Sequence, residues 1–292
     1  MGKVWLFLMK KIALINDMSG FGKCSLTAAI PVISVLGLQA CPLPTAVLSA
    51  QTGFPNYYYK DFTDSMNTYT DSWVEMGVSF DGIYSGYLGS AEQIQNVLYF
   101  LERFHKEHTI FLADPIMGDN GKSFSIFTPE LLSGMRELTK EANVITPNLT
   151  ELCLLANVDY DSLVSHSHEK DYQERIREAA HNLLWNAHTP QTVIVTGIVR
   201  NDPQHTYMGN LAVTADNCFY AETPYTGQSF SGTGDLFASI IIGSLVKGLP
   251  VYAAINKAAY FLQPAIEEAT KNGTPRNHGI PFEKYLHSLP DA

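Results

Sequence analysis

The chain has 292 residues, of which 46% are hydrophobic and 16% are charged, and its formal net charge is −10. This composition is typical of a globular protein, and the length allows one large α/β domain or two small ones. The acidic balance argues against a general nucleic-acid surface or an anionic-membrane surface, because both attract clustered positive charge.

The cysteines and the N-terminus bear on cellular location. The chain has four scattered cysteines, Cys24, Cys41, Cys153 and Cys218. None forms a Cys-x-x-Cys pair, so we expect neither a zinc site nor a thioredoxin-like site, and a reducing cytoplasm suits them. The apolar run at residues 4–9 is too short for a signal peptide, and we interpret residues 1–9 as an extension before the first strand. No run is long enough to cross a membrane.

In chain order, the first half alternates short apolar runs with helical patterns. Apolar runs followed by turn residues predict strands at residues 11–16, 40–48, 81–89 and 109–114. Helical patterns follow at residues 24–36, 62–76 and 91–105. The loop at 17–23 has neither Gly-x-Gly-x-x-Gly nor a Walker A sequence, so we discard both nucleotide motifs. The tyrosine-rich residues 56–61 are expected either to face a ligand or to cover an edge of the core.

The second half continues the alternation. Helices are predicted at residues 129–141, 171–186, 236–245 and 251–270, with more helix near the C-terminus. Strands are predicted at 143–146 and 191–197, and an antiparallel hairpin at 207–216 and 218–223. This order predicts an α/β fold over residues 10–292, a single doubly wound domain whose central sheet is mostly parallel, with helices on both faces.

Acidic and polar residues follow two of the predicted strands. Asp114 and Asp119 come after the strand at 109–114, where ligands collect in an open α/β sheet. Thr146 or Asn148 can cap the next helix with Glu151 in its first turn, and this capping interpretation is strong on pattern alone.

A glycine-rich turn runs into an apolar helix at Gly232-Thr233-Gly234-Asp235. Glycine amides at a helix N-terminus favour an anion such as phosphate. Asp235 could accept a proton from a hydroxyl that attacks phosphorus, although a simple helix cap is an equally good interpretation of these four residues.

Four patches in this order resemble the pyridoxal/pyridoxine kinases of the ribokinase-like superfamily: residues 114–121, 146–151, 193–197 and 232–235. The resemblance covers nearly the whole chain from Lys10 onward. It implies transfer of the terminal phosphate of ATP to the 5′-hydroxymethyl group of a B6 vitamer, with Mg²⁺ and with a role for a monovalent cation left open. It also implies a homodimer, and no nucleic-acid or membrane partner is expected.

The resemblance also implies roles for single residues. Asp235 is the implied base, with an anion hole formed by Gly232, Thr233 and Gly234. The residues implied near ATP, besides Gly232 and Gly234, are Asp114, Asn148 and Thr196. The residues implied on the metal side are Asp119, Thr146 and Glu151. The residues implied in the pocket for the substrate ring, together with Asp235, are Asp17, Thr52 and Tyr87.

Other functions stay open at this point. Hydroxymethylpyrimidine (phosphate) kinases are similar, and the loop that begins at Asp17 resembles theirs, whereas they usually have Cys at the position of Asp235. A sugar or nucleoside kinase of the same fold is a third possibility, and a pyridoxal-phosphate carrier or sensor is the non-enzymatic one. Because the phosphate must be kept from water, we expect a mobile cover at residues 118–124 or 197–207.

Overall fold

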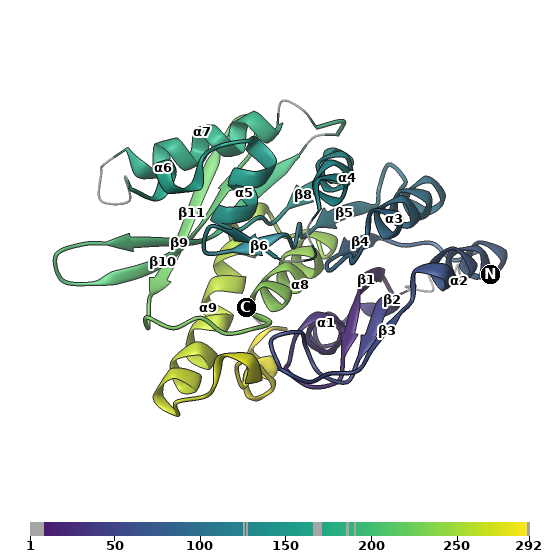
Figure 1. The fold of residues 1–292 in the computed structure, drawn as a ribbon, viewed down its shortest axis with the longest axis horizontal. Coiled ribbons are helices and arrows are strands. Elements are labelled where there is room, and N and C mark those ends of the chain that lie inside the picture. Colours follow the sequence, from purple (N-terminus) through teal and green to yellow (C-terminus); the bar gives the residue numbers. More distant parts are fainter. Residues whose placement is uncertain are drawn as a thin grey trace, which may run out of the picture.

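A nine-stranded sheet forms the centre of the molecule (Figure 1), in the order β11-β10-β9-β8-β5-β4-β1-β2-β3. The computed structural model describes residues 9–124, 126, 128–165, 171–184, 187–189 and 191–290. Residues 1–8 of the expected extension, and the last two residues of the helix predicted at 171–186, lie outside these ranges. No helix in the described ranges is both long and apolar enough to cross a bilayer.

Most of the sheet is parallel, as predicted. The parallel strands are β1 (Lys11–Ser19), β2 (Gln39–Leu48), β4 (Gly82–Ser85), β5 (Ile110–Ala113), β8 (Val144–Ile145) and β9 (Thr192–Asn201). The antiparallel strands are β3 (Tyr59–Asp61) at one edge and β10 (Thr206–Val213) and β11 (Cys218–Pro224) at the other. The predicted β10–β11 hairpin is therefore confirmed.

Helices cover both faces of the sheet (Figure 1). One face carries α1 (Ser25–Val35), α8 (Thr233–Val246) and α9 (Val251–Lys271). The other carries α2 (Thr63–Glu75), α3 (Ala91–Phe104), α4 (Pro129–Lys140), α5 (Leu149–Ala156), α6 (Tyr160–Ser165) and α7 (Tyr172–Leu184). Along β1, Ile12 and Leu14 enter the first core while Ala13 and Ile15 enter the second, as alternation along a strand requires. The doubly wound α/β prediction is confirmed.

Some elements differ from prediction. The hairpin of β6 (Gly118–Asp119) and β7 (Lys122–Ser123) is too short to show periodicity, and α6 was not predicted. The strand predicted to stop at Gly197 continues to Asn201, because Gly197 has φ +73° opposite a register shift in β10 and makes a bulge. Near the C-terminus the helix is 3₁₀, as η1 (Arg276–His278) and η2 (Phe282–Ser288).

Near one edge of the sheet, strand β2 contains two prolines and strand β3 begins in a group of exposed tyrosines. Pro42 and Pro44 fit inside β2 because the pairing with β3 begins only at Ala46, beyond both prolines. Tyr58 and Tyr59 are exposed, and Tyr59 opens the edge strand β3. The tyrosine-rich segment therefore lies at the surface.

Strands β4, β5 and β8 end at one level, and β1 passes the same level at Ile15 before it continues to Ser19. Ile15 pairs with Ser85, Ser85 with Ala113, and Ala113 with Ile145. The next residue in each strand therefore stands in one row along the edge of the sheet: Asn16, Gly86, Asp114 and Thr146. Helix α8 packs against β4 and β5 and begins at this edge, so the fold brings the glycine-rich turn to the strand ends.

Candidate active site

Asp235 lies where α8 meets the sheet edge. Its side chain is 8% exposed, and its Oδ1 accepts hydrogen bonds from Asn16 Nδ2 at 3.0 Å and from the Tyr84 hydroxyl at 3.4 Å. Burial raises the pKa of Asp235 from 3.8 to about 6, against the opposing effect of these donors and of the Ser25 backbone. The carboxylate therefore points at the strand ends and does not cap its own helix, which favours the functional interpretation of this residue.

Asn16 connects Asp235 to the end of β1. While its Nδ2 binds Asp235, its Oδ1 accepts from the backbone N–H groups of Asp17 at 2.9 Å and Tyr87 at 2.8 Å. Gly86 makes room for this amide, since a Cβ there would lie 2.3 Å from Asn16 Nδ2. Asn16 is fully buried, so the network fixes the spacing between β1, the residues after β4 and the Asp235 carboxylate.

Asp17 is a second buried carboxylate at this edge. It accepts hydrogen bonds from Ser25 Oγ at 2.5 Å and Ser19 Oγ at 2.7 Å. Burial raises its pKa above the ordinary value, and the two hydroxyls oppose that rise. Because Asp17 is only 6% exposed, its carboxylate can contact a ligand only if that ligand enters the space at this edge of the sheet.

Asp114 and Glu151 extend the acidic cluster along the edge. Thr146 Oγ1 donates to Asp114 Oδ1 at 2.9 Å. Burial, reinforced by the charge of Asp235, raises the pKa of Asp114 to about 7. Burial, reinforced by the charge of Asp114, raises the pKa of Glu151. These acids are close enough to repel one another, which is the environment that a cation would stabilise.

Glu151 also closes the start of α5. Asn148 Oδ1 accepts from Glu151 N at 3.0 Å, and Glu151 Oε2 accepts from Asn148 N at 2.8 Å. The capping interpretation is thus confirmed as a capping box. Asn148 also donates through Nδ2 to Gly118 O at 2.9 Å and forms a parallel bridge with Thr196. The predicted positions Asn148, Glu151 and Thr196 therefore lie together, around the start of the β6–β7 hairpin.

The glycine-rich turn at residues 232–235 is the candidate anion cradle. Gly232 has φ +83°, and a Cβ there would lie 2.1 Å from Lys23 O, so only glycine fits. At Gly234, in contrast, a Cβ would meet no heavy atom of the described chain within 4 Å. The Thr233 hydroxyl donates to Phe230 O at 3.0 Å and so turns back into the loop. The space beside Gly234 is therefore open at the first turn of α8, where helix amides have no intrahelical partner and an anion can bind.

Three predicted residues lie farther from this centre or are occupied by other partners. Thr52 is exposed in the loop after β2. Tyr87 is half-buried with its backbone on Asn16, and burial together with the Tyr59 hydroxyl raises its pKa. Asp119 forms an ion pair with Arg276 at 3.2 Å between Oδ2 and Nη2.

Sequence reasoning missed Asn16, Tyr84 and Ser25. Asn16 follows directly from the rule that functional residues gather at strand ends, which we applied to Asp114 and not to β1. Ser25 binds Asp17 from an unusual backbone conformation with φ +53°, which no sequence pattern indicates. Tyr84 reads as an ordinary core residue in a buried strand, so nothing marked it.

The donors at the edge fit a magnesium nucleotide. In the described ranges no group of three or more His, Cys, Asp or Glu side chains is arranged as a metal cage. Mg²⁺ in phosphoryl-transfer sites keeps several waters and binds one or two carboxylates plus the phosphates, so no cage is needed. Asp114, crowded by Asp235 and next to Glu151, is a carboxylate of the kind that such a site uses.

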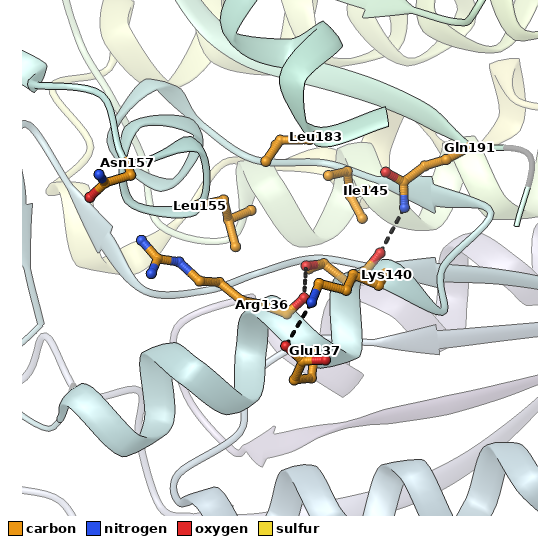
Figure 2. A pocket seen from close by; sticks show the side chains of 9 residues that line it. Arg136, Glu137, Lys140, Ile145, Leu155, Asn157, Leu183 and Gln191 are labelled. Atoms are coloured by element: carbon orange, nitrogen blue, oxygen red, sulfur yellow. Dashed lines mark hydrogen bonds and ion pairs between the residues drawn. The ribbon is translucent and has the colours of Figure 1, made fainter. Parts of the chain in front are cut away.

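A cavity of about 280 Å³ lies away from this edge, between α4, the end of α5 and α7. Figure 2 shows its polar groups binding one another: Lys140 pairs with Glu137 at 2.7 Å, and Gln191 Nε2 donates to Thr139 O at 2.7 Å. Arg136 Nη2 donates to Leu154 O at 2.6 Å. These polar groups bind one another or carbonyl groups near helix ends, so the cavity does not resemble a catalytic site.

Similarity to known proteins agrees with this geometry. A Bacteroides thetaiotaomicron protein, provisionally named a phosphomethylpyrimidine kinase and crystallised with pyridoxal, is 38% identical with a TM-score of 0.88, and the alignment covers 97% of this chain and 96% of that one. Pyridoxal kinase from Lactobacillus plantarum is 25% identical with a TM-score of 0.84, over 97% of each chain. Pyridoxal kinase PdxY of Deinococcus radiodurans is 27% identical over 82% of this chain and 80% of its own length.

The family follows from a match that spans most of the chain. The sequence pattern of the phosphomethylpyrimidine kinase family matches residues 22–280. This range includes Asp235, the glycine-rich turn, Asp114 after β5 and Glu151 in the first turn of α5. The chain is therefore a kinase that belongs to the phosphomethylpyrimidine kinase family.

Proposed function

We propose that this protein phosphorylates the 5′-hydroxymethyl group of pyridoxal, pyridoxine and pyridoxamine with ATP. The observation that carries the proposal is the position of Asp235, a buried carboxylate held by Asn16 in the first turn of α8, next to the open space at Gly234. The pyridoxal kinases among its relatives, and the pyridoxal in the Bacteroides crystals, support the choice of substrate. A carrier or sensor of pyridoxal phosphate would not need a base beside an anion cradle.

In the proposed mechanism Asp235 accepts the proton of the attacking hydroxyl. With a pKa of about 6, it is mostly ionised at neutral pH and still basic enough to share a proton in the transition state. Asn16 holds Oδ1 of Asp235 in place. The hydrogen bond from Tyr87 N to Asn16 fixes this carboxylate relative to β1 and to the residues after β4. Positioning of this kind supplies much of the rate of phosphoryl transfer.

In the proposed mechanism the glycine-rich turn binds the phosphate that is transferred. The amides of Gly232, Thr233 and Gly234 bind the phosphoryl oxygens as their charge grows. Asp114, Asp119, Thr146 and Glu151 would hold Mg²⁺, in part through water, and Asn148 and Thr196 would bind the remaining phosphates. Bound Mg²⁺ neutralises phosphate charge and orients the leaving group.

The ring of the substrate would lie between β1, Tyr87 and the loop that contains Thr52. Asp17 would bond a ring nitrogen or a ring hydroxyl. The family match and this carboxylate also favour a second candidate, phosphorylation of hydroxymethylpyrimidine or its phosphate. The two substrates share an alcohol on a small heteroaromatic ring, so the same base and cradle would serve both.

A coupled assay of ADP release with each of the three vitamers and with the aminopyrimidine alcohol tests the proposal. Turnover that requires both a vitamer and Mg²⁺ supports it, and turnover with the aminopyrimidine alone replaces it by the second candidate. ATP consumption that no vitamer and no aminopyrimidine stimulates refutes both.

We further propose that residues 10–292 act as one kinase domain in the cytoplasm, and as a homodimer. The described cysteines are all free thiols, which suits a reducing compartment. The covers proposed for the site are residues 118–124, which contain β6 and β7, and residues 197–207, which contain the β9–β10 turn. Light scattering tests the dimer, and limited proteolysis with and without nucleotide tests the covers. Equal cleavage of both segments in the two states would refute them.

A further inference from the structure

The segment after α9 returns to the anion cradle. Ser231 N donates to Arg276 O at 3.1 Å, directly before Gly232. Gln51 Nε2 holds both sides of this junction, donating to Ser231 Oγ at 3.3 Å and to Asn277 O at 3.2 Å. The backbone of Arg276 is therefore tied to the turn that begins α8.

The side chain of Arg276 extends from that turn to the β6–β7 hairpin. Its Nε donates to Ser229 Oγ at 3.3 Å, and its Nη2 pairs with Asp119 Oδ2 at 3.2 Å. The guanidinium thus joins the loop that leads into the anion cradle to Asp119, a residue proposed for the metal side. A group in this position borders the space where a terminal phosphate would lie.

The pair with Asp119 is one that a nucleotide could displace. The side chains of Arg276 and Asp119 are 55% and 41% exposed, and ion pairs this exposed are weak. A phosphate carries more charge than a carboxylate and matches the planar fork of arginine in two hydrogen bonds.

We propose that Arg276 binds the terminal phosphate of the nucleotide and that Asp119 holds it over the site until the nucleotide arrives. Binding exchanges one anion for another on Arg276 and frees the carboxylate of Asp119 for the metal side. The exchange also changes the link between the C-terminal segment and the hairpin. This inference rests on the nucleotide site proposed above.

The test compares ATP with ADP, because only ATP has the phosphate that Arg276 would bind. Titration calorimetry would measure the Kd of each magnesium nucleotide for wild type, Arg276→Gln and Arg276→Lys. We expect Arg276→Gln to raise the Kd of MgATP about 10- to 100-fold and that of MgADP less than about threefold. Arg276→Lys keeps the charge without the fork and should lie between. Arg177→Gln, which removes an exposed Arg–Glu pair on α7, is the control and should change neither Kd.

Two results would overturn the inference. An equal loss of MgATP and MgADP affinity would make Arg276 a tether of the loop, and unchanged affinity for both would remove it from the site. If wild type phosphorylates a vitamer in either case, the proposed function stands. Failure of wild type to phosphorylate any vitamer overturns that function instead, while the ratio of the two Kd values still decides the role of Arg276.

Discussion

Replacing Asp235 by Asn tests both its role as base and the energetic consequence of burying it. The rise of its pKa from 3.8 to about 6 disfavours the ionised folded state by about 3 kcal/mol, at about 1.36 kcal/mol per pH unit. Because the folded pKa is the higher one, the folded protein binds more protons between these two pH values. The penalty therefore grows as pH rises from about 4 to about 6 and stays constant above. Asn removes the charge while its carbonyl can still accept from Asn16.

We expect Asp235→Asn to be more stable than wild type at pH 8 by about 3 kcal/mol, or about 5 °C in Tm for a chain of this size. The difference should fall to about 0.5 kcal/mol at pH 4. Turnover should fall by about 10²- to 10⁴-fold while MgATP binding persists, and Asp235→Ala should lose turnover likewise.

Urea unfolding at the two pH values, with steady-state kinetics at pH 8, measures these effects. Asp202→Asn is a control of opposite sign, because the backbone N–H groups of Gln204 and His205 lower the pKa of Asp202. That variant should lose stability at pH 8. Turnover near wild type in Asp235→Asn would refute the base, and a stability gain that persists in full at pH 4 would refute the electrostatic reasoning.

Three other predictions concern the same edge of the sheet. The kcat/KM of wild type should fall as pH drops through about 7 and 6, where Asp114 and then Asp235 become protonated, and a flat profile would contradict both assignments. Gly232→Ala should lose at least about 2 kcal/mol of unfolding free energy, because its Cβ would meet Lys23 O. The matched Gly234→Ala variant should fold normally and lose turnover. Normal melting of Gly232→Ala would refute the close approach to Lys23. Asn16→Ala should cost about 1–3 kcal/mol in urea unfolding and move the acidic limb of the rate profile to higher pH, because Asp235 loses a donor; an unmoved limb would contradict that link.

Much of the fold follows from local pattern. The apolar runs of β1, β5 and β9 could be recognised because strands buried on both faces are continuously hydrophobic. The turn at Gly232 could be recognised because a glycine-rich run stands directly before an apolar helical segment, and Gly232 adopts the positive φ that glycine favours. The β6–β7 hairpin escaped prediction because two-residue strands have no period to detect.

The sequence by itself determined the order of most strands and helices along the chain, and the residue types at the ends of the predicted strands. Only the tertiary structure decided which of these residues meet. Asn16 and Asp235 are 219 positions apart in the sequence, and nothing in the sequence around either residue indicates the 3.0 Å hydrogen bond between them. Arg276 and Asp119 are 157 positions apart, and the sequence around them likewise gives no sign of their contact. Side-chain periodicity records which face a residue buries, but the contact between two distant faces is set by sheet order and helix packing, which depend on the whole chain at once.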